Sequence, residues 1–159
     1  MERCQGEDVI LRAPHEVELP ALAELCFRSK AVWGYDAAFM EACRPVLQVD
    51  PELARRGLAR VAVADTALVG VAQVSLDGDE AELDLMFIDP KHQGLGAGRR
   101  LFRWAVDAAR SRRVRRLVIL SDPCARPFYE KMGASYVRMA PSDAIAGREL
   151  PLLQLALRP

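Results

Sequence analysis

A glycine-rich segment, DPKHQGLGAGRR at residues 89–100, most strongly constrains how this chain can fold. An apolar run, AELDLMFI, precedes it, and apolar residues at helical spacing follow it from Ala97. Pro90 holds Asp89 in extended backbone and ends the apolar run. The segment is therefore predicted to join a strand to the start of a helix, where unpaired backbone N–H groups and the helix dipole favour a phosphate.

Two common nucleotide-binding loops do not fit this segment. A dinucleotide loop needs GxGxxG, but Arg99 or Leu101 occupies the third glycine position, depending on the register. A Walker A loop needs Gly-Lys followed by Ser or Thr, and the chain has no Gly-Lys pair. A further alternative is that the glycines only make a tight turn against the sheet.

The length, composition and charge of the chain limit the classes of protein to which it can belong. The chain has 159 residues, 51% hydrophobic and 28% charged, as expected for one globular domain with a sizeable core. Lys plus Arg equals Asp plus Glu at 22 each, so no general attraction to nucleic acid or an anionic membrane is predicted. The first ten residues lack a signal-peptide core, and no apolar run reaches the roughly 18 residues of a membrane span. We therefore expect a cytoplasmic protein.

The four cysteines are Cys4, Cys26, Cys43 and Cys124. They stand far apart and form neither a CxxC pair nor a cluster with histidine, so neither a zinc site nor a disulfide framework is predicted. We expect reduced thiols in the core and no bound metal.

Hydrophobic periodicity predicts a layered α/β (α+β) domain with a mixed sheet. A first strand is expected within residues 7–13, and helical segments from Pro14 to residue 57, with a break near Pro45. Three strands are expected at 58–65, 67–78 and 81–90, followed by a helix from Ala97 and a strand at 115–120. A short helix within 121–134 and strands at 135–140 and 150–157 complete the order.

Two motifs together resemble those of the GNAT N-acetyltransferases. Gln93-x-x-Gly96-x-Gly98 directly after a strand resembles the family's pyrophosphate loop, Q/R-x-x-G-x-G/A. SDPCARPFYEKMGA at residues 121–134 resembles the family's later segment, N-x-x-A-x-x-F-Y-x-x-x-G-F. Asp122 and Ala134 stand where Asn and Phe are usual. The first departure puts a contact to the pantetheine arm in doubt, and the second removes an aromatic side chain from the core.

The resemblance implies one GNAT-like domain over residues 1–159, with a mostly antiparallel sheet of about seven strands and acetyl-CoA as the acetyl donor. Residues 58–134 would bind acetyl-CoA, residues 1–57 would form the acceptor side, and residues 135–159 would supply the C-terminal strands. The residues implied to contact acetyl-CoA are Met86, Phe87 and Ile88 at the strand end, Gln93, Gly94, Leu95, Gly96, Ala97, Gly98 and Arg99 at the loop, and Asp122 and Tyr129 downstream. Arg100 is a second arginine that can reach the phosphates.

Acetyl transfer from a thioester to an amine needs a base for the amine proton and an acid for the leaving thiolate. Tyr129 matches the family tyrosine whose hydroxyl lies near the CoA sulfur, so the resemblance implies that it is the acid. Glu82 and Asp84 are two residues apart and share one strand face, and we rank Glu82 first because some family members place their base there. The alternative roles are a solvated strand face for both carboxylates and plain packing for Tyr129.

Three further residues are candidates for contact with the acceptor. Trp33 and Tyr35 lie where family members wall the acceptor site, although Trp33 can equally pack in the core, and Arg148 can receive an acidic group. His92 is expected to face solvent, and Cys124 lacks the partner of a nucleophile.

We therefore expect an N-acetyltransferase that acts on a primary amine of a small molecule or peptide in a ternary complex. No nucleic-acid, membrane or metal partner is expected, and a homodimer is left open. The alternative is a catalytically silent GNAT-like protein that binds acetyl-CoA as a sensor or interaction module.

Overall fold

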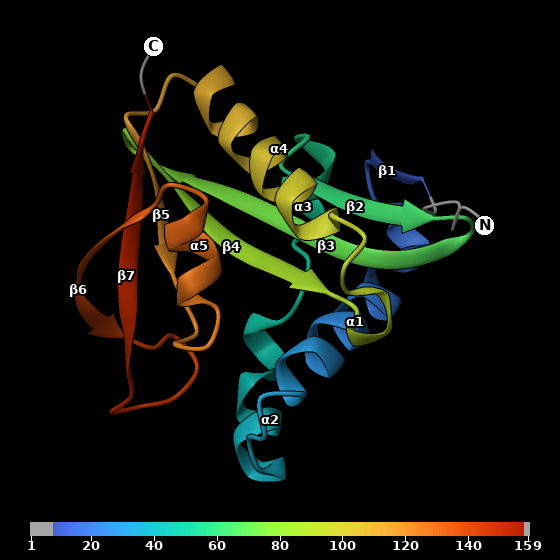
Figure 1. The fold of residues 1–159 in the computed structure, drawn as a ribbon, viewed down its shortest axis with the longest axis horizontal. Helices are drawn as coiled ribbons and strands as arrows, with labels where there is room; N and C mark the ends of the chain where they lie inside the picture. Colours follow the sequence, from blue (N-terminus) through green and yellow to red (C-terminus); the bar gives the residue numbers. More distant parts are fainter. Residues whose placement is uncertain (1–7, 158–159) are drawn as a thin grey trace, which may run out of the picture.

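Residues 8–157 are described by a computed structural model, and their first part is a short edge strand followed by helices (Figure 1). β1 spans Val9–Arg12, α1 spans Leu19–Ala31, α2 spans Ala37–Cys43 and α3 spans Pro51–Arg55. The helical spacing that was predicted from Pro14 starts as a 3-10 turn at Glu16–Glu18. The predicted break near Pro45 is a change from α2 to a 3-10 turn at Arg44–Val46.

The remaining elements complete one sheet with helices on both faces. They are β2 (Ala59–Ala64), β3 (Ala67–Asp77), β4 (Glu80–Ile88), a 3-10 turn at Pro90–His92, α4 (Ala97–Ser111), β5 (Arg116–Leu120), α5 (Arg126–Lys131), β6 (Ser135–Pro141) and β7 (Glu149–Ala156). The strand order is β1-β2-β3-β4-β5-β7-β6, and among these residues only β4 and β5 run parallel. The predicted fold class, a mixed and mostly antiparallel sheet of seven strands, is confirmed.

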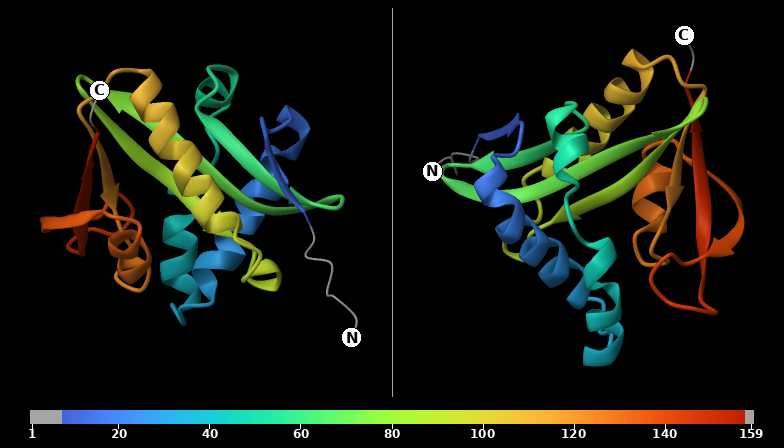
Figure 2. Two further views of the ribbon diagram at one scale, coloured as in Figure 1. Left: turned by 45° about the horizontal axis from the view of Figure 1, so that its top comes forward. Right: turned by 180° about the vertical axis from the view of Figure 1, so that it is seen from behind.

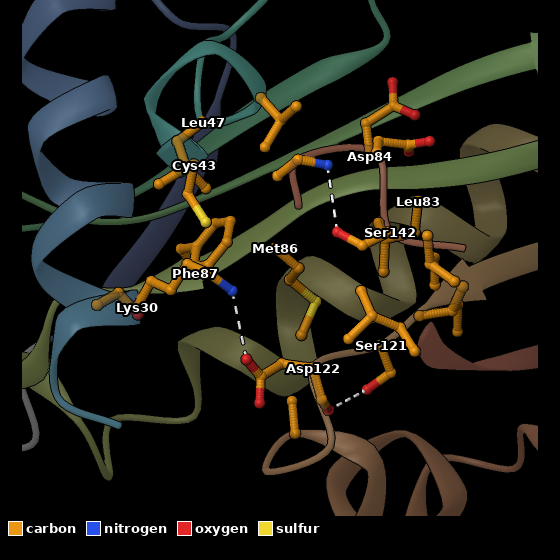
Figure 3. A pocket seen from close by; sticks show the side chains of 18 of the residues that line it. Lys30, Cys43, Leu47, Leu83, Asp84, Met86, Phe87, Ser121, Asp122 and Ser142 are labelled. Atoms are coloured by element: carbon orange, nitrogen blue, oxygen red, sulfur yellow. Dashed lines mark hydrogen bonds and ion pairs between the residues drawn. The ribbon is translucent and has the colours of Figure 1, made fainter. Parts of the chain in front are cut away.

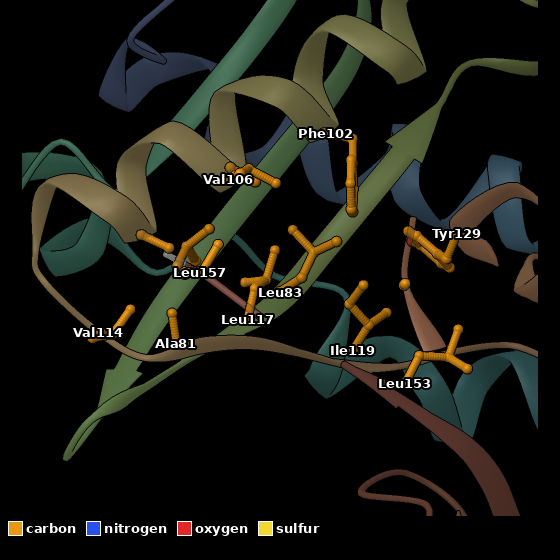
Figure 4. Close-up of a cluster of buried hydrophobic side chains, with 14 of the residues drawn as sticks. Ala81, Leu83, Phe102, Val106, Val114, Leu117, Ile119, Tyr129, Leu153 and Leu157 are labelled. Carbon is orange, nitrogen blue, oxygen red and sulfur yellow. The ribbon is translucent and has the colours of Figure 1, made fainter. Parts of the chain in front are cut away.

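Two helices cover opposite faces of the sheet, as the views in Figure 2 show. On one face, Phe102 and Val106 of α4 pack with Leu83 of β4 and Ile119 of β5 (Figure 4). On the other face, Leu22, Leu25 and Cys26 of α1 pack with residues of β2, β3 and β4. The apolar stripes of α1 and α4 therefore hold the sheet between two hydrophobic layers.

The sheet opens between β4 and β5. Their pairing covers only three residue pairs and ends at Glu82 opposite Val118, whereas β4 continues to Ile88 and β5 stays paired with β7 (Figure 1). A bulge lies at the same point, because Leu83 and Leu85 oppose consecutive residues of β3 and Asp84 is the extra residue. As a result, Leu83 packs on the α4 side of the sheet and Leu85 on the α1 side.

The cysteines only partly follow the prediction. Cys26 and Cys43 are buried free thiols, as expected, but Cys124 is exposed because it lies in the turn before α5. Cys4 lies outside the described residues. Within residues 8–157 no group of three metal-ligating side chains is found, and no helix has the length and apolar character needed to cross a membrane.

We predict that Gly70 of β3 is needed for close packing. A Cβ atom there would lie 2.7 Å from the Ile88 side chain, 3.0 Å from that of Leu101 and 3.2 Å from the Phe87 carbonyl oxygen. Gly70→Ala is expected to lower the free energy of unfolding by about 1–3 kcal/mol, measured by urea denaturation.

Gly98→Ala is the matched control, because a Cβ on this α4 residue would make ordinary contacts of 3.6 to 3.8 Å. It should leave the free energy of unfolding equal or slightly higher, since alanine favours helix more than glycine does. An unchanged urea midpoint in Gly70→Ala would contradict the prediction.

Candidate functional site

A pocket of about 220 Å³ lies where β4 and β5 diverge (Figure 3). Its wall combines the ends of both strands with parts of α1, the segment after α2, α5 and the loop between β6 and β7. The sequence-predicted residues that line it are Trp33, Glu82, Asp84, Met86, Phe87, Asp122, Tyr129 and Arg148. The fold therefore brings the candidate base, acid and acceptor residues to one pocket.

The backbone of β4 offers hydrogen-bond donors to this gap. The Asp89 N–H donates to the Val69 carbonyl of β3 at 2.8 Å. Because N–H groups alternate sides along a strand, the Phe87 N–H also points toward β3, whereas those of Met86 and Ile88 point away from it into the gap. Of the predicted strand-end residues, Met86 and Ile88 therefore present N–H groups to the gap between β4 and β5, and Phe87 does not.

The two carboxylates on β4 differ in their partners. Asp84 accepts hydrogen bonds from Ser75 Oγ at 2.8 Å and Gln73 Nε2 at 3.2 Å. Within residues 8–157 no hydrogen bond engages the half-buried Glu82 carboxylate. Burial raises the pKa of Glu82, and the nearby negative charges of Asp84 and Asp143 raise it further. Glu82 is thus the carboxylate that is free to take a proton.

Tyr129 lies at the boundary between the pocket and the core. Its ring packs 5.9 Å from that of Phe102 and 5.4 Å from that of Phe128, and only 7% of the residue is exposed. Burial, followed by the negative charge of Asp122, raises the pKa of the Tyr129 phenol well above its ordinary value. The hydroxyl therefore keeps its proton at neutral pH.

The glycine loop has the geometry of an anion site. Gly94 and Gly96 have φ angles of +86° and +77°, and Gly96 is the N-cap of α4. The first backbone hydrogen bond of α4 runs from the Arg100 N–H to the Gly96 carbonyl at 3.1 Å. The N–H groups of Ala97, Gly98 and Arg99 thus have no acceptor within the helix, which suits an oxyanion.

The side chains of this segment differ in their surroundings. Gln93 is exposed, and Leu95 is half-buried against the α4 side of the sheet. Arg99 lines a second, open concavity of about 600 Å³ between α4 and α5, together with Arg103 and Lys131.

An ion pair ties the start of the loop to α1. Arg28 Nη2 lies 2.9 Å from Asp89 Oδ2, and the other carboxylate oxygen of Asp89 accepts the Lys91 N–H at 3.0 Å.

His92, which was expected to face solvent, is half-buried, so that prediction is wrong. Its Nδ1 is enclosed and finds no hydrogen-bond partner within the described chain.

Two of the three acceptor candidates, Tyr35 and Arg148, meet at Asp122. The Tyr35 hydroxyl donates to Asp122 Oδ2 at 2.6 Å and accepts from Arg148 Nη2 at 2.8 Å. The Cys124 N–H donates to the other oxygen of Asp122 at 2.9 Å. Tyr35 thus supports the pocket from behind its wall, and both oxygens of Asp122 are engaged by protein groups.

Trp33 is 48% exposed at the pocket wall, so it is not a core residue.

Lys30, Ser142 and Asp143 are among the pocket residues that were not predicted from the sequence. Lys30 precedes Trp33 by three residues. This closeness to a predicted acceptor residue was the one feature of the sequence that could have identified Lys30. Ser142 and Asp143 come from an irregular loop whose residues carry no such pattern.

Comparison with known proteins identifies the family. The Acetyltransferase (GNAT) family matches residues 26–134, whereas curated protein sequences give no significant match. PaiA N-acetyltransferase from Thermoplasma acidophilum, solved in complex with coenzyme A, has a TM-score of 0.75 and 15% identity, over 94% of this chain and 99% of that one.

Two further solved structures share the fold. The ribosomal-protein-S18-alanine N-acetyltransferase from Escherichia coli has a TM-score of 0.68 and 20% identity, covering 94% of each chain. A GCN5-related N-acetyltransferase from Rhodopseudomonas palustris has a TM-score of 0.74 and 20% identity, over 93% of this chain and 95% of that one. Because the family match spans most of a chain with this fold, the protein belongs to the GNAT family of acetyltransferases.

Proposed function

We propose that this acetyltransferase moves the acetyl group of acetyl-CoA to a primary amine of a small molecule or peptide. The observation that carries the proposal is the gap between β4 and β5, where one pocket is lined by Glu82, Asp84 and Tyr129. The coenzyme A bound to the structurally similar PaiA N-acetyltransferase supports the choice of donor.

The residues at the glycine loop and on β4 fit such a donor. The free N–H groups at the start of α4 would bind the pyrophosphate, and Arg99 would add positive charge beside it. The N–H groups of Met86 and Ile88 would bind the pantetheine arm and the thioester oxygen. Acetyl-CoA supplies the acetyl group in activated form, as a thioester.

Two side chains would then handle the protons. A C–N bond forms and the C–S bond of the thioester breaks, so the amine loses a proton and the sulfur gains one. Glu82 takes the amine proton, directly or through a water, because its carboxylate has no other partner within residues 8–157 and its pKa is raised. Tyr129 donates its proton to the sulfur, since burial keeps its hydroxyl neutral.

The decisive experiment measures CoA release from acetyl-CoA across a panel of small amines and peptides. We expect turnover with a subset of them, and we expect Tyr129→Phe to lower kcat by roughly 10²-fold while changing the KM for acetyl-CoA little. The phenylalanine ring keeps the packing against Phe102 and Phe128, so the loss should occur without unfolding.

Tyr136→Phe is the matched control, because Tyr136 is an exposed tyrosine on the edge strand β6. Unchanged turnover in Tyr129→Phe would remove Tyr129 from the mechanism. Binding of acetyl-CoA without turnover on any amine would favour a silent binding protein.

The glycine loop gives a second prediction. An alanine at position 96 must adopt a φ near +77°, which costs about 1–2 kcal/mol. Gly96→Ala should therefore populate the binding-competent loop less and raise the Kd for CoA roughly tenfold in calorimetric titration. Gly98→Ala should bind CoA as wild type does. Equal affinity in the two variants would show that the loop does not hold the phosphates.

Glu82→Gln should separate activity from stability. We expect kcat to fall by roughly 10²-fold, and by more than in Asp84→Asn, because Asp84 is already held by Ser75 and Gln73. The raised pKa means that Glu82 makes its full contribution to stability below the unfolded glutamate pKa of about 4.3, and that this contribution is lost as the pH rises through the higher folded value.

Removing the charge should therefore raise the thermal midpoint of Glu82→Gln at neutral pH, and the gain should vanish near pH 4. A variant that is less stable at neutral pH would contradict the raised pKa, and full activity would remove Glu82 as the base.

A further inference from the structure

Four side chains from distant segments form a charged cluster at one side of the pocket. They are Lys30 of α1, Tyr35 before α2, Asp122 after β5 and Arg148 before β7, and we call them the Asp122 cluster. Lys30 Nζ lies 3.3 Å from Asp122 Oδ2 and Arg148 Nη2 lies 4.0 Å from the same oxygen. Figure 3 shows Lys30 reaching Asp122 beside Met86.

The Asp122 cluster carries more positive charge than negative charge. Two cations face one carboxylate, so one positive charge is left over. Within the described chain, Lys30 Nζ gives one of its three N–H donors to Asp122, and Arg148 gives one of its five to Tyr35. The Lys30 and Arg148 side chains are only 13% and 21% exposed, so little water reaches the spare donors. Both residues line the pocket.

Aromatic rings hold the two cations in place. The rings of Tyr35 and Phe39 stack with centroids 4.2 Å apart. The Arg148 guanidinium lies 5.0 Å and 4.8 Å from those two centroids, and Lys30 Nζ lies 5.2 Å from that of Tyr35. Such cation–π contacts fix the direction of the donors before any ligand arrives.

A second side of the same pocket, where Figure 3 shows Asp84 away from Lys30 and Asp122, carries negative charge. Glu82, Asp84 and Asp143 line it there, and their charges interact closely enough to raise the pKa of Glu82, in addition to the effect of burial. A cationic amine is attracted to this side and a monoanion to the Asp122 cluster. Because both sides belong to one pocket of about 220 Å³, one small molecule can reach both.

We propose that the acceptor is a small zwitterion, an amine that also carries a carboxylate, whose carboxylate is bound by Lys30 and Arg148 while its amine lies at Glu82. The inference rests on the proposed acetyl transfer. A carboxylate matches the single surplus charge and the planar donor fork of Arg148, whereas a phosphate would bring nearly two negative charges. Arg148 and Lys30 are then the residues that select the acceptor.

The test compares matched acceptors in the CoA-release assay: each common amino acid, its carboxamide and the amine that lacks the carboxyl group. At least one free amino acid should have a kcat/KM about tenfold or more above that of its carboxamide. Arg148→Gln should reduce this ratio toward one by raising the KM for the amino acid, and Lys30→Met should act in the same direction.

Two further variants keep the result interpretable. Arg148→Lys retains the charge without the fork and should keep part of the preference. Arg138→Gln, on an exposed arginine of β6, should keep all of it. Efficient transfer to amides, plain amines or peptides with no preference for the carboxylate would overturn the inference and leave the proposed function standing. Acetyl-CoA binding without transfer to any amine would overturn the proposed function itself.

Discussion

The early end of the pairing between β4 and β5 is the constraint on which the rest of the site depends. After the Glu82–Val118 pair the two strands separate, because β5 remains fully paired with β7 while β4 follows β3. Backbone groups in a sheet interior are normally paired, so the N–H groups of Met86 and Ile88 must find other partners. The gap therefore offers unpaired backbone donors that a ligand can accept from, in addition to the role of the sheet as a scaffold.

Helix α1 connects the two halves of this site. Arg28 contacts Asp89 at the start of the glycine loop, and Lys30, two residues later, contacts Asp122 at the end of β5. The buried stripe of α1, which includes Leu22 and Leu25, fixes the helix on the sheet, so both contacts depend on the same hydrophobic packing. The glycine loop and the end of β5 are therefore both tied to one helix rather than to separate loops.

The sequence predicted the parts of this structure that are local. The order of strands and helices follows from hydrophobic period, and the loop from its glycines, because each depends on neighbouring residues. The shared pocket of Glu82 and Asp84 followed from strand alternation, although the bulge at Asp84 was not visible in the pattern. The partners of Asp122 could not be predicted, because Tyr35 and Lys30 are 87 and 92 residues away and meet it only through tertiary packing. The enclosure of His92 Nδ1 likewise depends on tertiary packing.

Glu82 and Asp122 are two carboxylates of one pocket whose pKa values shift in opposite directions. Burial disfavours the charge of both. At Asp122 the hydrogen bonds from Tyr35 and the Cys124 N–H, with the charge of Lys30, outweigh burial and lower the pKa, so this carboxylate is a fixed anion. Glu82 forms no ion pair within residues 8–157, and neighbouring carboxylates add to the effect of burial, so its pKa rises. A carboxylate with a raised pKa can take up a proton during a reaction. A carboxylate whose charge is stabilised by hydrogen bonds stays ionised and orients the side chains that donate to it.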